Sequence, residues 1–260
     1  MTPLQSTPRI SYRRVTIYTL TIVTAVIRGV PGASAESGFS YADLNTVLFK
    51  YVSPVGLVDY KGIVADPAAL NTFLASVGKD SPESDPSLFP THADQLTYYI
   101  NAYNAFAIQG VTARPGIRTV DSVKQAFFVG TTYLHGGRAI NLQDLEDKVR
   151  GYGDPRVHFA LNCQSVGCPR LPNTAFDAGK LDTQLDGYTR EFVTNPKQVS
   201  VDSAGVVHLS HLFDWYSKDF ATSGGAVAFI NTHGGSIPAT AKIEWVPYDW
   251  TLSAQPGRNP

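Results

Sequence analysis

Two cysteines lie close together in the stretch HFALNCQSVGCPRLP, residues 158–172 of a chain of 260 residues. They are Cys163 and Cys168, and the chain has no other cysteine. Four interpretations fit this C-x4-C spacing: a small disulfide loop, a nucleophilic thiol beside a second one, half of a metal site, or two unreactive buried thiols. A loop of this length can bring two Cα atoms within the roughly 7 Å that a disulfide requires. The spacing alone leaves all four interpretations open.

Catalysis by Cys163 would need a base to form the thiolate and a further group to orient that base. His211 is one candidate base, because it follows the cysteine in the chain and can share a helix face with Asp214. His158 is the other candidate and precedes Cys163 by five residues. Asn104 is the candidate for orienting a catalytic group. With this set, the chemistry would be attack on an amide or thioester bond.

The remaining ionisable side chains have weaker claims to chemistry. His92, His135 and His233 fall in loop or helix-start positions, which predicts solvent-exposed side chains. Asp249 and Glu146 could orient a base, but capping a helix or pairing with an arginine is the more common role of such acids. We expect no metal and no cofactor, because the cysteine pair lacks a second ligand pair for zinc and no glycine-rich phosphate loop follows a strand.

The first 35 residues have the composition of an export signal. They contain four arginines and no acid, followed by the apolar run VTIYTLTIVTAVI and a small-residue end at Ala33 to Ala35. The apolar run of about 13 residues is shorter than the roughly 20 needed to cross a bilayer. We therefore expect cleavage near Ala35 and a periplasmic or extracellular mature chain with no transmembrane segment. An uncleaved anchor is the alternative.

The mature chain, residues 36–260, is predicted to form one mixed domain. Loss of the four arginines changes the formal net charge from −1 to −5, which leaves no basic surface for nucleic acid. A hydrophobic content of 43% is enough for one sizeable core. An oxidising compartment would also permit a disulfide.

Hydrophobic periodicity predicts the elements that must position the cysteines. We expect helices over residues 40–52, 66–78, 91–110, 141–150, 177–195 and 211–220. Hairpins are predicted within 127–140 and 198–210, a buried strand over 157–161, and an edge strand over 243–253 that Pro247 interrupts. Helices and hairpins in mixed order predict an α+β fold, in which several helices surround short antiparallel strands.

The predicted helix 91–110 is apolar around most of its circumference, which is typical of a buried helix. It nevertheless carries Asn101 and Asn104, three residues apart. An unpaired buried amide costs about 1–3 kcal/mol. The two amides should therefore either hold neighbouring loops or serve a catalytic site.

Six motifs resemble one protein family, the domain of unknown function 547. They are VDYKG (58–62), YYINAYNAFAI (98–108), INLQDLEDKVR (140–150), DPRVHFALNCQSVGCPRL (154–171), LSHLFDWYSKDF (209–220) and YDWTLS (248–253). The resemblance implies an exported or membrane-linked bacterial protein, with a distant similarity to papain-like thiol enzymes. It also favours Cys163 as the functional thiol, because plant members have serine in place of Cys168. Three positions depart from the family's usual residues: Asp147, His211 and Ser253.

Two functions from different classes follow from these observations. The first is a thiol-dependent hydrolase or transferase, with Cys163 as nucleophile, His211 or His158 as base, and Asn104 and Asp214 in orienting roles. The second is a non-catalytic binding or scaffold domain, in which a disulfide joins Cys163 and Cys168. In either case the partner would be a small molecule or a peptide.

Overall fold

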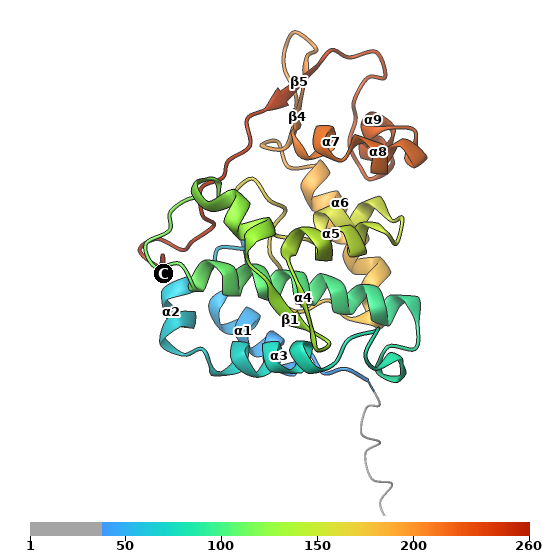
Figure 1. The fold of residues 1–260 in the computed structure, drawn as a ribbon. Coiled ribbons are helices and arrows are strands. Elements are labelled where there is room, and N and C mark those ends of the chain that lie inside the picture. The colour runs from blue at the N-terminus through green and yellow to red at the C-terminus, as the bar shows by residue number, and fades with distance from the viewer. Residues whose placement is uncertain (1–37) are drawn as a thin grey trace, which may run out of the picture. The chain divides into compact units, whose positions relative to one another are not determined.

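A long buried helix, α4 (His92–Thr112), runs through the middle of the computed structural model (Figure 1). The structure describes residues 38–260, which belong to one compact unit. The helix begins with a capping box, in which Thr91 and Asp94 each bond the other's backbone N–H. Nearly every residue from Leu96 to Val111 is buried. The prediction of a buried helix in this region is therefore confirmed.

The other elements precede and follow α4 in the sequence. The helices are α1 (Ala42–Tyr51), α2 (Tyr60–Ala65), α3 (Ala68–Lys79), α5 (Leu142–Arg150), α6 (Leu181–Val193), α7 (Leu212–Trp215), α8 (Ser217–Phe220) and α9 (Ala226–Thr232). Short 3-10 segments lie at Pro86–Leu88, Asp121–Val123, Pro155–Phe159, Ala178–Lys180 and Ala221–Ser223, and a π-helical turn at Ala126–Gly130. The strands are β1 (Tyr133–His135), β2 (Arg138–Ile140), β3 (Val199–Val201), β4 (Val207–Ser210) and β5 (Ile243–Val246).

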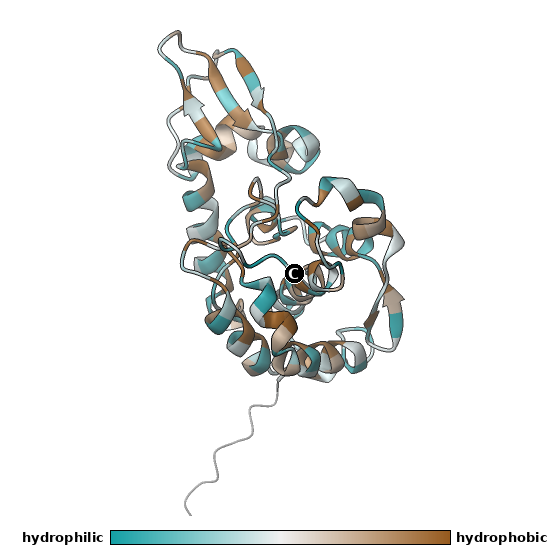
Figure 2. Ribbon diagram, turned by 90° about the vertical axis from the view of Figure 1, so that its left-hand side faces the viewer, coloured by the Kyte–Doolittle hydropathy of each residue, from teal (hydrophilic) through white to brown (hydrophobic). Residues whose placement is uncertain are grey.

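The hydrophobic side chains form two clusters. The larger one surrounds α4 and includes the inner faces of α1, α2, α3, α5 and the start of α6. The smaller one is rich in phenylalanine and joins Phe159, the end of α6, β4 and the helices α7 to α9. Figure 2 shows hydrophobic and hydrophilic residues interspersed along the outer helices, as expected for elements that bury only one face. The cysteine loop follows Phe159, where the two clusters adjoin.

Two small sheets complete the α+β fold that the sequence predicted. β1 and β2 form an antiparallel hairpin, with Tyr133 opposite Ile140. The second sheet has the order β3-β4-β5, and its first pair is the predicted hairpin. β4 and β5 are parallel, whereas the other two strand pairs are antiparallel as the sequence predicted. The long connection through α7, α8 and α9 lets β5 return in the same direction as β4.

The predicted buried strand at 157–161 was wrong. Residues Pro155–Phe159 form a 3-10 helix that begins at Asp154, whose side chain accepts a hydrogen bond from the Arg156 N–H. Pro155 occupies the first position, where its missing N–H costs nothing. A short buried apolar run is compatible with a strand or a helix, and here the cap decides.

The predicted helix 211–220 is divided into α7 and α8. Tyr216 lies between them with φ −108° and ψ 24°, outside the helical range. Phe213 and Phe220 belong to the smaller core, and the partly buried Tyr216 packs against it.

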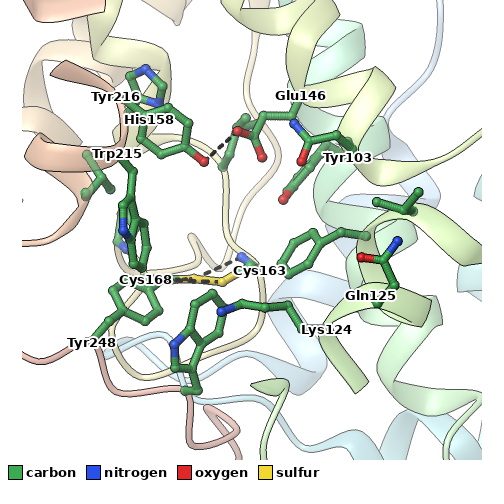
Figure 3. Close-up of a pocket in the computed structure, with 17 residues that line it drawn as sticks. Tyr103, Lys124, Gln125, Glu146, His158, Cys163, Cys168, Trp215, Tyr216 and Tyr248 are labelled. Carbon is green, nitrogen blue, oxygen red and sulfur yellow. Dashed lines mark hydrogen bonds between the residues drawn. A yellow bond between two sulfur atoms is a disulfide. The ribbon is translucent and has the colours of Figure 1, made fainter. Parts of the chain in front are cut away.

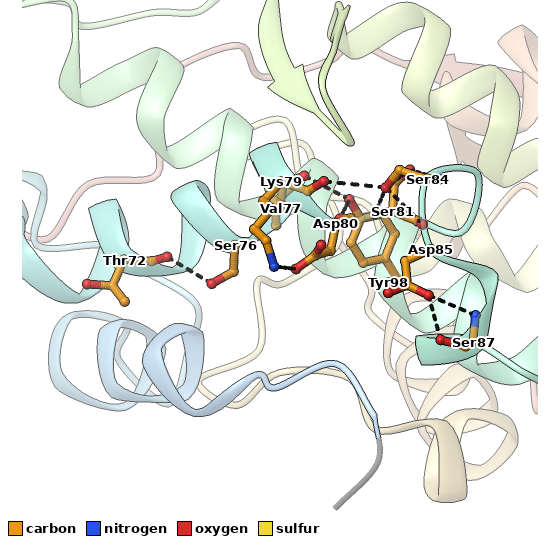
Figure 4. A network of polar contacts seen from close by, with 10 residues as sticks. All are labelled: Thr72, Ser76, Val77, Lys79, Asp80, Ser81, Ser84, Asp85, Ser87 and Tyr98. Carbon is orange, nitrogen blue, oxygen red and sulfur yellow. Dashed lines mark hydrogen bonds and ion pairs between the residues drawn. The ribbon is translucent and has the colours of Figure 1, made fainter.

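The proline-rich connection between α3 and α4 is tied down by polar contacts (Figure 4). Tyr98 of α4 donates its hydroxyl to the carbonyls of Val77 and Asp80, at 3.2 and 2.9 Å. Next to this connection, His135 of β1 is only 4% exposed and stacks on Tyr99. The expectation that His135 is solvent-exposed was therefore wrong, because the hairpin folds back onto α3 and α4.

The predicted export signal, with cleavage near Ala35, lies outside the described residues. Among residues 38–260, no helix is both long enough and apolar enough to cross a membrane. The C-terminal residue returns to the helical part of the molecule, where the Pro260 carbonyl accepts a hydrogen bond from the Gly116 N–H at 3.0 Å.

We predict that Asn104→Ala lowers the free energy of unfolding by about 2–4 kcal/mol, because it leaves the Ala160 carbonyl and the Asn162 N–H buried without their partner. Urea unfolding followed by circular dichroism measures this change. Asn71→Ala is the matched control, since Asn71 is an exposed residue of α3. Equal stability of the two variants would contradict the prediction.

Candidate functional site

A disulfide joins Cys163 and Cys168, whose Cα atoms are 6.3 Å apart. Of the four interpretations of the C-x4-C spacing, the structure contains the first. Neither sulfur titrates in this form, so Cys163 becomes a nucleophile only after the bond has been reduced. In the part of the chain that the structure describes, no group of three or more His, Cys, Asp or Glu side chains could hold a metal ion.

Buried amides fix the chain on both sides of the cysteine loop. Asn104 Nδ2 donates to the Ala160 carbonyl and Asn104 Oδ1 accepts from the Asn162 N–H, both at 2.9 Å. Asn101 makes the same pair of contacts with the backbone of Phe176, also at 2.9 Å. Asn104 is absent from the cavity lining, and these contacts account for both oxygen and nitrogen of its amide. They match the loop-holding alternative.

The loop itself contains one strained residue. Gln164 has φ 68°, the single positive φ of a residue other than glycine in the described chain. Its side chain is completely buried, and its Oε1 accepts a hydrogen bond from Tyr60 Oη at 2.7 Å. Asn162 Oδ1 accepts from the Gln164 backbone N–H at 2.7 Å. These buried contacts offset the cost of the left-handed backbone.

The C-terminal segment runs along the cysteine loop and pairs with it. Val166 and Gly167 donate their backbone N–H groups to the carbonyls of Thr251 and Asp249, both at 2.8 Å. Ser253 donates in return to the Gln164 carbonyl at 2.9 Å. This pairing brings Tyr248 to the disulfide, where its hydroxyl donates to Cys168 Sγ at 3.0 Å and lies 3.4 Å from Cys163 Sγ.

The disulfide faces a cavity of about 320 Å³ (Figure 3). Six aromatic residues line it: Tyr103, Phe128, Trp215, Tyr216, Tyr248 and Trp250. The polar or charged residues are Lys124, Gln125, Gln143, Glu146 and His158. Figure 3 shows the sulfur atoms between Trp215 and Tyr248 on one side and Lys124 and Gln125 on the other. The aromatic side chains come from α4, α7, the π-helical turn and the C-terminal segment.

Glu146 places a carboxyl group in the wall of this cavity. The side chain is 7% exposed and accepts a hydrogen bond from Tyr216 Oη at 2.6 Å. Burial raises the pKa of Glu146 above its ordinary value, and the hydrogen bond from Tyr216 only partly opposes that effect. The protonated form, which can donate a hydrogen bond into the cavity, is therefore favoured relative to that of an exposed glutamate.

His158 also lines the cavity, together with Cys163. Its Nε2 lies 2.8 Å from Asp219 Oδ2, and its ring stacks on Tyr216 with centroids 4.1 Å apart. Burial lowers the pKa of His158 to about 4, although the Asp219 carboxylate acts in the opposite direction. Arg150 binds the same carboxylate and lowers the pKa of Asp219. The imidazole is neutral near pH 7 and is held by a structural ion-pair network.

His211 and Asp214 do not reach the cavity. His211 is at the start of α7, with its Nδ1 3.5 Å from Asp214 Oδ2 and its ring stacked between Trp215 and Trp245. Neither residue lines the cavity that contains Cys163. The structure therefore brings His158 together with Cys163 and leaves the predicted His211–Asp214 pair outside. The catalytic roles proposed for all these residues stay predictions.

Sequence reasoning missed several residues of the cavity. Tyr248 lies in a segment that was predicted only as an edge strand, and neither Tyr216 nor Lys124 was predicted as a residue of the site. The one available signal was the motif YDWTLS, whose aromatic residues follow Pro247 and therefore need not lie in a strand. Glu146 was weighed as an acid that could orient a base, but its contact with Tyr216, between α7 and α8, is a tertiary one.

Comparison with protein families finds one similarity, over part of the chain. Residues 88–193 match the model of the family described as "Protein of unknown function, DUF547". This segment is therefore similar to that family. The match extends from the start of α4 to the end of α6 and contains the whole cysteine loop, so the predicted resemblance is confirmed there. The comparisons with curated proteins and with solved structures gave no match.

We predict that the stability of Glu146→Gln relative to the native protein increases as the pH rises from about 4 to 8. The pKa of Glu146 is higher in the folded than in the unfolded chain, so its contribution is complete at low pH and is lost as the pH rises through the folded pKa. Glutamine retains an acceptor for Tyr216 Oη. Urea midpoints at three pH values measure the trend.

Glu83→Gln is the control with the opposite sign. Burial alone would raise the pKa of Glu83, but hydrogen bonds from Lys148 and Tyr99 outweigh it and lower this pKa to about 2. The native protein should therefore gain stability relative to Glu83→Gln as the pH rises through the acidic range. Parallel trends for the two variants would contradict the assignment of Glu146.

Proposed function

We propose that this protein is a binding domain for a small molecule with a flat apolar body and a hydrogen-bond acceptor. The observation that carries this proposal is the aromatic cavity over the disulfide, with the Glu146 carboxyl in its wall. A volume of about 320 Å³ is within the usual range of small-molecule sites. Aromatic faces bind flat apolar groups, and the raised pKa of Glu146 makes its carboxyl easier to protonate, in which form it donates to a carbonyl or ether oxygen.

The disulfide supports a binding role for this site. It closes the loop that forms one side of the cavity, and both cysteine residues are more than nine-tenths buried. Together with the buried amides of α4, it keeps that wall in one conformation before a ligand enters. Such pre-organisation reduces the entropy lost on binding.

We predict that Trp215→Ala weakens the binding of 8-anilinonaphthalene-1-sulfonate, a flat aromatic probe with an anionic sulfonate group, about tenfold. Trp215 lines the cavity, so its removal takes away one aromatic face. Trp245→Ala is the matched control, because Trp245 is comparably exposed on β5 but does not line the cavity. Fluorescence titration gives both dissociation constants. Equal constants for the two variants would place the probe elsewhere and reject this site.

A second candidate is a thiol-dependent hydrolase or transferase that acts on an amide or thioester bond, with Cys163 as nucleophile. One observation favours it: Cys163 lines the same cavity as His158. Two observations oppose it, since the sulfur is held in a disulfide and the His158 Nε2 is already paired with Asp219. The binding role is therefore the better supported of the two.

Labelling of the native protein with iodoacetamide separates these candidates. We expect no labelling of Cys163 or Cys168 before reduction, and labelling of both afterwards, because the disulfide protects both sulfur atoms. Mass mapping of tryptic peptides identifies the labelled residue. Rapid labelling of Cys163 without any reductant would contradict the binding proposal and favour the hydrolase.

A further inference from the structure

We propose that the Cys163–Cys168 disulfide is a thiol–disulfide exchange site, in which Cys168 is the sulfur that leaves as a thiolate. Two donors point at Cys168 Sγ, the Cys163 backbone N–H and Tyr248 Oη, each at 3.0 Å. Cys163 Sγ has longer contacts, 3.4 Å from Tyr248 Oη and 3.6 Å from Ser165 Oγ. This asymmetry is the basis of the proposal.

The two hydrogen bonds to Cys168 Sγ become stronger when the disulfide opens. A disulfide sulfur is a weak acceptor, whereas a thiolate carries a full charge and accepts charge-assisted hydrogen bonds, which are about twice as strong as neutral ones. A donor that strengthens on bond breaking lowers the pKa of the departing thiol. A leaving thiol of lower pKa departs faster in exchange.

The donors are also fixed in advance. The N–H of Cys163 belongs to the loop that Asn104 holds from the central helix. Tyr248 belongs to the C-terminal segment that is paired with residues 164–167 of the loop. Both anchorages are hydrogen bonds that involve neither sulfur atom, so we expect both donors to remain in place when the bond breaks. The Cys168 thiolate therefore forms where two hydrogen-bond donors are already in position.

The cavity gives a thiol access to Cys163. Cys163 and Cys168 both line a space of about 320 Å³, which is large enough for a cysteine side chain or a small thiol. Lys124 lies in the same lining, over the Trp250 ring and 3.4 Å from the exposed Asp121 carboxylate, and its cation favours an incoming thiolate to the extent that this pair is screened by water. The substrate class is thus a dithiol, either of a small molecule or of a peptide segment that can enter the cavity.

Exchange proceeds in two steps, formation and then resolution of a mixed disulfide. A substrate thiolate bonds to Cys163 Sγ, the Cys163–Cys168 bond breaks, and its electron pair remains on Cys168 Sγ. The second substrate thiol then loses its proton to water and attacks the substrate sulfur of the mixed disulfide. Cys163 departs and takes up a proton. The substrate is oxidised to a disulfide by two electrons, and the cysteine pair is reduced.

The decisive experiment compares the two thiols after reduction. The whole chain is reduced with dithiothreitol, and the rate of iodoacetamide labelling of each cysteine is mapped by mass spectrometry across pH. We expect an apparent pKa of Cys168 that is lower than that of Cys163 and below about 8.5. A lower pKa for Cys163 would overturn the proposal and would instead favour the hydrolase.

A variant tests the role of the tyrosine. We predict that Tyr248→Phe raises the apparent pKa of Cys168 by about 1 and slows reduction of the native disulfide by dithiothreitol about threefold to tenfold. Tyr152→Phe is the control, since Tyr152 Oη bonds Gln95 and does not line the cavity. No difference between the variants would overturn the proposal. If Tyr248→Phe fails to fold, the titration of the native thiols still decides the question.

Failure of this proposal and failure of the binding proposal are distinguishable. Probe binding to the oxidised chain depends on Trp215 and needs no exchange. Disulfide reduction depends on Tyr248 and needs no bound ligand. A disulfide that dithiothreitol reduces only at urea concentrations that unfold the chain would reject exchange and leave the binding role untouched.

Discussion

The structure around the disulfide depends on two buried amide side chains of α4. Asn101 and Asn104 use both their nitrogen and oxygen atoms to hold the backbone at Phe176 and at Ala160 and Asn162. A helix buried on nearly all sides can carry such groups only if their hydrogen bonds are complete, because an unpaired buried amide is costly. Because both amides must keep these hydrogen bonds, they determine the path of the chain before and after the cysteine loop.

The second constraint on the loop comes from a distant part of the sequence. Backbone pairing of residues 249–253 with residues 164–167 joins the C-terminal segment to the loop, and it brings an aromatic hydroxyl to a sulfur 80 residues away. A short loop held from one side could still rotate. Held between a buried helix and a paired segment, it presents both sulfur atoms in one direction. Aromatic residues of α4 and of the C-terminal segment line the cavity beside this loop.

The sequence was a good guide to local structure and a poor guide to contacts between distant elements. Caps and apolar periodicity located α1, α3, α4, α5 and α6, and the need of Asn101 and Asn104 for partners was foreseeable from their place in an apolar helix. Residues 155–159 formed a 3-10 helix because a capping aspartate outweighed a pattern that fits either state. The burial of Glu146 and the approach of Tyr248 to Cys168 arise from tertiary contacts that no local pattern encodes. The sequence therefore predicted the two cysteines of the site but not the residues that line the cavity around them.

The charged side chains near the cavity are partly exposed, whereas its buried ionisable groups favour their neutral forms. Arg150 and Asp219 keep their charges on the outer side of His158, where both side chains are about a quarter exposed and water contributes to their solvation. Burial of His158 and Glu146 favours the neutral form of each. The interior thus has few obligatory charges, with Lys124 at the partly exposed side as the exception. In such surroundings a new negative charge on sulfur would meet little competition for the fixed donors around it, because hydrogen bonds to a charge strengthen as the local polarity falls.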